Sequence, residues 1–176
     1  MGYPPPVGPY VPPPTPGQMA GYAAAQAKRR NRTGGSWLVG AAVLHVITIP
    51  VALFLLKAFV EFQVGRSVSW GELFNAFAAT GGMPLILAGV FAQLTFAFFA
   101  GVGAVLLSRQ VAGVAVAMVV VGIVAVIFSF AIFGGIVGAL GGFLSIAGGA
   151  TAWPRTPAYP FPPPIAAWPP PGPPRP

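Results

Sequence analysis

The 176-residue chain contains no cysteine, one histidine and two acidic residues. Without cysteine there can be no disulfide, thiolate metal site, iron–sulfur cluster or cysteine nucleophile. The sequence also has too few acids and bases for acid–base or metal catalysis, and it has no Ser/His/acid set and no phosphate-binding loop. We therefore predict that the protein is not an enzyme and that it binds no metal and no cofactor.

Charge is equally scarce: 6% of the residues are charged, whereas 56% are hydrophobic. Soluble domains carry roughly 25% charged residues. A chain with so little charge cannot cover a surface that faces water. The composition therefore predicts that the lipid bilayer is the solvent for most of this chain.

Four apolar runs are long enough to cross a bilayer, which needs about 20 helical residues. We place them at about 37–60, 84–107, 111–131 and 136–153. Pro50 removes a helical hydrogen bond in the first run, so we expect a kink there, with neighbouring helices or Thr48 satisfying the freed carbonyl. The predicted fold is all-α: a polytopic membrane protein with a four-transmembrane-helix bundle over residues 34–153.

Proline crowds both ends of the chain, in residues 1–33 and 154–176. Such segments favour extended polyproline II and have no apolar face to bury, so we expect disordered tails. Binding of the tails to proline-recognising grooves is the alternative. Between the first two spans, Ser69 and Glu72 have the spacing of a helix capping box. They predict a short interfacial helix over about 70–79, or else only a frayed start of the second span.

With four spans, both tails and the turn at 108–110 lie on one side of the membrane. That side holds seven of the nine basic residues: Lys28, Arg29, Arg30, Arg32, Arg109, Arg155 and Arg175. The positive-inside rule then predicts a multi-pass protein of the cell membrane with both termini in the cytoplasm. Setting this topology explains the cluster Lys28, Arg29, Arg30 and Arg32. Binding of anionic lipid headgroups is the sharper alternative, and nucleic-acid binding is not expected.

Polar side chains are few inside the spans, and those of interest in the first two are His45, Thr48, Gln93 and Thr95. Polar residues in a bilayer are candidates for function, although interhelical hydrogen bonding is the simpler interpretation. His45 lies about 12 Å and Gln93 about 21 Å from the cytoplasmic ends of their spans, at about 1.5 Å per residue. We therefore expect no direct bond between them, and we expect Thr48 to lie closer to the level of Gln93 and Thr95.

Small residues recur at helical spacing in the last span. Gly134, Gly138 and Gly142 form one stripe, and Gly141, Ser145 and Gly149 form the next. Similar pairs are Ala97 with Gly101, Ala100 with Ala104 and Gly113 with Ala117. Glycine lets helix backbones approach closely, which drives association in lipid. The stripes could pack within the bundle or between protomers; we favour the bundle, because a short turn already holds the last two spans together.

The chain also resembles a known family. The residues that carry the resemblance are the basic lead-in to the first span, Leu85–Leu107, the turn Ser108–Gly113 and the glycine-rich segment Gly134–Gly149. Over about residues 30–153 these resemble an uncharacterised family of small four-span membrane proteins of archaea and Gram-positive bacteria. The resemblance implies the topology and adds no catalytic residue.

Two functions from different classes fit these features. The first is a non-enzymatic scaffold or accessory subunit of a membrane complex, acting through helix packing and its Pro-rich tails on a membrane-protein partner or as a homo-oligomer. The alternative is a small oligomeric channel or transporter, which would need polar positions aligned along the bundle. An enzyme acting on lipid comes third, because nucleophile–base pairs are missing.

Overall fold

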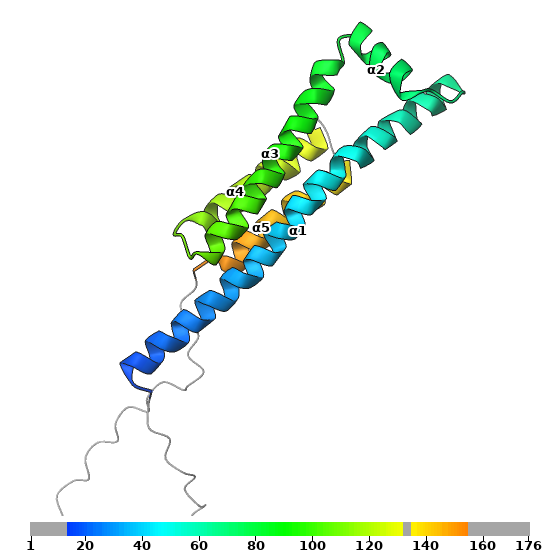
Figure 1. Ribbon diagram of the computed structural model, residues 1–176. Helices are drawn as coiled ribbons and strands as arrows, with labels where there is room; N and C mark the ends of the chain where they lie inside the picture. Colours follow the sequence, from blue (N-terminus) through cyan, green and yellow to red (C-terminus); the bar gives the residue numbers. More distant parts are fainter. Residues whose placement is uncertain (1–13, 132–134, 155–176) are drawn as a thin grey trace, which may run out of the picture. The chain divides into compact units, whose positions relative to one another are not determined.

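The computed structural model describes residues 14–131 and 135–154, and this part of the chain is all-helical. Five helices follow one another (Figure 1): α1 (Pro16–Val64), α2 (Trp70–Ala79), α3 (Met83–Ser108), α4 (Val114–Ala131) and α5 (Gly135–Ala152). Among the described residues, α1, α3, α4 and α5 are long and apolar enough to cross a membrane. Residues 27–154 form one compact unit. The tail residues 1–13 and 155–176 and the turn residues 132–134, Gly134 included, lie outside the described residues.

The start of α1 differs from our prediction of an unstructured tail as far as residue 33. The helix begins at Pro16, more than four turns before the first apolar run. Thr15 caps it, because its hydroxyl accepts a bond from the Gln18 amide while the Gln18 side chain accepts one from the Thr15 amide. Proline is tolerated at the first helical position, and the alanine-rich residues that follow are strong helix formers. Residues 16–33 are therefore helical despite the prolines before them.

Inside the unit formed by residues 27–154, the four long helices alternate in direction. Gly34 of α1 lies against Gly148 and Ala152 of α5 and Leu107 of α3, so the part of α1 around Gly34 meets the ends of α3 and α5. We call this the basic end, because Lys28, Arg29, Arg30, Arg32 and Arg109 lie beside it in the sequence. At the other end, α2 bridges the end of α1 and the start of α3 (Figure 1).

The interior of the bundle follows a seven-residue repeat. The fully or nearly buried residues include Ile86, Gln93, Ala100 and Leu107 of α3; Ala115, Gly122 and Ser129 of α4; and Gly138, Ser145 and Ala152 of α5. This is the spacing with which helices pack side chains into one another along a slight crossing angle. Large apolar side chains instead point outward: Phe54, Phe59, Phe91, Phe98, Ile127 and Phe130 are all at least 60% exposed. The interior therefore combines small and polar residues with a few larger apolar ones such as Leu38, Leu107 and Met118, and the exposed apolar side chains cover the outside.

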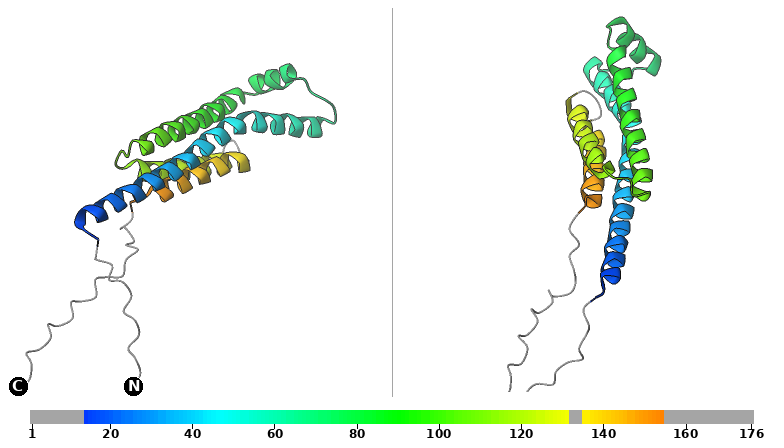
Figure 2. Two further views of the ribbon diagram at one scale, coloured as in Figure 1. Left: turned by 60° about the horizontal axis from the view of Figure 1, so that its bottom comes forward. Right: turned by 90° about the vertical axis from the view of Figure 1, so that its left-hand side faces the viewer.

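α1 continues through Pro50 without a break. The left view of Figure 2 shows that the helix changes direction in its cyan middle portion, as expected for a proline inside a helix. The predicted role of Thr48 at this point is wrong. The Thr48 hydroxyl donates to the carbonyl of Leu44, one turn earlier, and not to the carbonyl freed by the proline.

The turn from α3 to α4 is longer than we predicted. Gln110 has a positive φ of 58°, and the amides of Gln110 and Val111 donate to the carbonyls of Leu107 and Leu106. This is a Schellman ending, in which one residue in the left-handed conformation closes the helix. Gly113 also has a positive φ, of 80°, so α4 begins only at Val114 and the predicted Gly113–Ala117 packing pair does not form on one helix.

The loop between α1 and α2 is organised by two carboxylates. The predicted capping box is present, because the Ser69 amide donates to Glu72 and the Glu72 amide donates to the Ser69 hydroxyl. Glu61 accepts bonds from Lys57, from the Ser67 hydroxyl and from the Val68 amide. The bond from Lys57 and then that from Val68 lower the pKa of Glu61 from its ordinary value of 4.5 to about 2.

We therefore expect the loop to loosen in acid. Because the pKa of Glu61 is lowered by folding, the stabilisation is complete above pH 4.5 and is lost as the pH falls toward 2. Trp70, whose ring lies 5.8 Å from the Lys57 ammonium, would report the change in a variant whose other tryptophans are replaced by phenylalanine. Its emission should stay constant from pH 8 to 5 and shift below 4.5.

Glu72 provides the control for this prediction, because the Ser69 amide and then Arg66 also lower its pKa. Glu61→Gln should leave a smaller acid transition that belongs to Glu72, and the double variant with Glu72→Gln should show none. An unchanged acid transition in the double variant would show that other groups hold the loop.

Candidate functional site

A polar layer crosses the interior of the bundle and joins three helices. His45 of α1, Gln93 of α3 and Ser129 of α4 are almost completely buried. The Nδ1 atom of His45 lies 2.7 Å from Oε1 of Gln93, and Nε2 of Gln93 donates to the Ser129 hydroxyl at 3.3 Å. Because an amide oxygen only accepts, Nδ1 of His45 carries the hydrogen in this arrangement. We call these three residues the polar layer.

The His45–Gln93 bond overturns our expectation that the two side chains lie too far apart in depth. That expectation counted residues from the ends of the apolar runs, as if all four spans began at one level. The structure places the start of the packed part of α1 at Gly34, three residues before the predicted span, where it meets Leu107 of α3. This register removes about half of the expected difference in depth, and the 2.7 Å contact shows that the two side chains meet.

α5 contacts the polar layer through two glycines. A Cβ atom at Gly141 would lie 2.9 Å from the His45 ring, and one at Gly138 would lie 2.6 Å from the Ser129 hydroxyl and 3.0 Å from Nε2 of Gln93. Glycine is therefore required where α5 closes over the polar side chains. Nε2 of His45 is buried and has no hydrogen-bond partner among the described residues. Phe96 also lies beside the ring, at 5.5 Å between centroids.

The two threonines of our prediction do not join this layer. Thr48 is buried one turn beyond His45, and its hydroxyl bonds within α1. Thr95 is exposed and donates to the carbonyl of Phe91 in its own helix. Ser145 is buried, and it donates to the carbonyl of Gly141. The interhelical polar contacts therefore come from His45, Gln93 and Ser129, and our sequence analysis had not assigned Ser129 to the set.

The glycines of α5 form two neighbouring seams, one that faces α4 and one that faces α1. A Cβ atom at Gly142 would lie 2.7–2.8 Å from Val126 and the carbonyl of Gly122, and Gly149 is equally close to Ala115 and Val119, so both face α4. Gly141 and Gly148 face α1 instead. The seams thus run at seven-residue spacing, and the predicted stripe of Gly141, Ser145 and Gly149 is divided, because Gly141 faces α1 and Gly149 faces α4.

The predicted small-residue pairs on α3 separate into an inner and an outer pair. Ala100 is completely buried and Ala104 packs against the core. A Cβ atom at Gly101 would meet nothing within 4 Å, so Ala97 and Gly101 are left without a partner helix.

The basic cluster occupies the exposed early turns of α1. Lys28, Arg29 and Arg32 are exposed, and Arg30 is half-buried with an Nε atom that has no partner among the described residues. The only acidic residues, Glu61 and Glu72, are paired with Lys57 and Arg66 near α2. No carboxylate of the chain therefore lies near these four charges in the described structure.

The chemistry available to the polar layer is hydrogen bonding. No group of three histidine, cysteine, aspartate or glutamate side chains that could hold a metal ion occurs in residues 14–131 and 135–154. Comparison of the chain with protein-family models, with curated proteins and with solved structures finds no match. The family resemblance remains a prediction, and the function has to be argued from the geometry.

Proposed function

We propose that the protein is a non-enzymatic integral membrane protein that serves as a scaffold or accessory subunit of a membrane complex. The observation that carries this proposal is the closed interior of the bundle. Glycine seams bring the backbones together, and the hydrogen bonds of the polar layer join α1, α3 and α4, while many large apolar side chains point outward. Such a surface suits lipid or the helices of a partner.

The positions of tryptophan support membrane insertion. Trp37 and Trp153 lie near the basic end, each 43% exposed, and Trp70 lies in α2 at the other end. Tryptophan gathers at both interfaces of a bilayer because its ring is apolar and its N–H is polar. These tryptophans would then lie at the two interfaces of the bilayer, with the outward apolar surface between them.

The polar layer also favours a second candidate function, a small oligomeric channel or transporter. Intramembrane ionisable residues often mark a path for protons or ions, and His45 keeps one unpartnered nitrogen among the described residues. The bonds of the layer run across the bundle, however, whereas a path needs polar groups along it. We therefore rank the scaffold first.

Isolation of the native protein in mild detergent separates the two functions. A scaffold should bring down a stoichiometric membrane-protein partner. A partner-free homo-oligomer that passes ions in liposomes, with the flux abolished by His45→Leu, would favour the channel and overturn the scaffold.

The proposed orientation, with both termini cytoplasmic, can be tested because the chain has no cysteine. Ser67 and Ser108 are exposed at opposite ends of the described bundle. In intact cells a membrane-impermeant maleimide should label Ser67→Cys and leave Ser108→Cys unlabelled until the cells are permeabilised. The reverse pattern would place the basic end outside, and labelling of both residues in sealed cells would contradict insertion across the membrane.

A further inference from the structure

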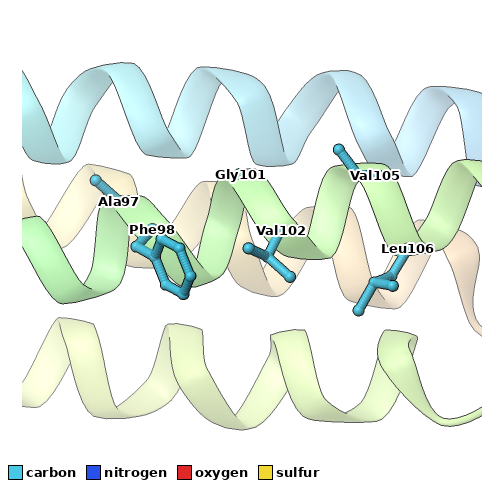
Figure 3. Close-up of a pocket in the computed structure, with 6 residues that line it drawn as sticks. All are labelled: Ala97, Phe98, Gly101, Val102, Val105 and Leu106. Carbon is cyan, nitrogen blue, oxygen red and sulfur yellow. The ribbon is translucent and has the colours of Figure 1, made fainter.

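A shallow apolar groove runs along the outward face of α3 (Figure 3). Its volume is about 400 Å³, and its lining comes entirely from this helix: Ala97, Phe98, Gly101, Val102, Val105 and Leu106. The groove exists because Gly101 has no side chain and nothing lies within 4 Å of the place where a Cβ atom would be. Phe98 and Val105, 65% and 52% exposed, stand on either side of it along the helix.

The positively charged Arg109 follows the groove at the C-terminal end of α3. Arg109 follows Val102 by seven residues, Val105 by four and Leu106 by three, so it lies on the same face of the helix as the near end of the groove. The amide of Arg109 still donates to the carbonyl of Val105, and the Schellman ending fixes the backbone here. The Arg109 side chain is exposed, with no ion pair or hydrogen bond to any described residue. Both acids of the chain are paired near α2.

The length of the groove matches half a bilayer. From Leu106 to Ala97 is nine residues, or about 14 Å at 1.5 Å per residue. One leaflet contributes about 15 Å of hydrocarbon. A linear apolar chain that begins near Arg109 would thus reach the midplane at the far end of the groove.

We propose that this groove binds an acyl chain of an anionic phospholipid from the leaflet at the basic end, with Arg109 at the phosphate. The proposal rests on the membrane insertion proposed above. A second copy of this chain is the competing occupant, because paired small residues also let two helices pack. A parallel symmetric contact through this face would place two Arg109 side chains together, and their repulsion opposes it. An anionic headgroup instead supplies the missing counter-charge.

Photo-crosslinking tests the groove. The full chain, reconstituted in vesicles of phosphatidylcholine and phosphatidylglycerol, is exposed to phosphatidylglycerol that carries a diazirine on one acyl chain, and the adducts are mapped. We expect adducts within residues 97–106. Unlabelled phosphatidylglycerol should compete for the site better than phosphatidylcholine of the same chain length.

Three substitutions sharpen the result. Arg109→Gln should lower the preference for phosphatidylglycerol about fivefold, the factor that corresponds to about 1 kcal/mol per basic residue. Gly101→Leu should remove the adducts by filling the groove, and the open space around Gly101 should let this variant fold. Arg32→Gln, a charge on α1 at the same end, should leave the adducts in 97–106 unchanged.

Four outcomes would overturn the proposal: adducts spread evenly over the outward helix faces, an unchanged yield in Gly101→Leu, equal competition by the two lipids, or a crosslinked dimer through α3 in place of lipid adducts. Failure of membrane insertion would be seen separately, as loss of the protein from the vesicles before illumination. A failed groove and failed membrane insertion are thus distinguishable.

Discussion

Gly142→Leu is expected to prevent the bundle from closing, and Gly142→Ala alone should lower the free energy of unfolding by about 1–3 kcal/mol. A methyl group at this position would lie 2.8 Å from the carbonyl oxygen of Gly122 and from the amide nitrogen of Val126. These are backbone atoms of α4, which cannot turn aside as a side chain can. The helices would have to separate along the whole seam, and the contacts that hold them in lipid would weaken together.

Gly101→Ala is the matched control, because it adds the same methyl group to a glycine inside an apolar helix of the same bundle. Nothing lies within 4 Å of its position, and alanine is the better helix former by up to about 1 kcal/mol. We expect this variant to be neutral or slightly more stable. Unfolding by increasing denaturing detergent, followed by far-ultraviolet circular dichroism, measures both variants. Equal losses at the two positions would show that helix propensity, and not the seam, decides stability.

Gly122 tests the same seam from the other side. A Cβ atom there would lie 2.6 Å from the carbonyl of Gly142 and 2.8 Å from the amide of Ile146. Gly122→Ala should therefore cost a similar amount. Once one methyl group has separated the helices, the second has less to displace, so the double variant should lose less than the sum of the two single losses.

The small residues of α5 show which part of the packing the sequence predicts and which part it does not. Glycines and a serine four apart suggested two stripes, which we expected to pack within the bundle. In the structure, Gly141 and Gly148 face α1, whereas Gly142 and Gly149 face α4. Four residues advance more than one helical turn, so a four-residue stripe drifts around the helix, whereas seven residues nearly complete two turns. Hydropathy alone predicts the four spans. It does not predict which helix each glycine contacts, because this depends on the seven-residue repeat with which the helices pack.

Two capping boxes give a second comparison. The pair Ser69–Glu72 was recognised, and it marks the start of α2 as expected. The pair Thr15–Gln18 makes the same reciprocal bonds at the start of α1, but the prolines around it led us to assign the segment to a disordered tail. We gave the proline-rich composition more weight than the Thr15–Gln18 spacing, which marks the start of the helix. The packed part of α1 begins at Gly34, before the apolar run, and this contributed to the misplacement of His45 when depths were measured from that run.

Gln93→Leu should lower the stability of the bundle by about 1–3 kcal/mol, because it leaves the Nδ1 hydrogen of His45 buried without an acceptor. His45→Leu should also be costly, since it leaves the Gln93 oxygen without its donor. The double variant should lose less than the sum of the two, by a coupling of about 0.6 kcal/mol and at most about 1.7. The same detergent unfolding measures this cycle.

Thr95→Val is the control for the polar layer, because Thr95 is exposed and its hydroxyl bonds only within α3. It should change the stability by less than about 0.5 kcal/mol. Additive losses for His45 and Gln93 would mean that each side chain contributes only through its own packing. A measured coupling would show that the bond ties α1 to α3 at one level. The polar layer would then fix how far α1 is shifted along α3. Glycine seams alone would not fix this shift, because helices packed backbone to backbone can slide along each other.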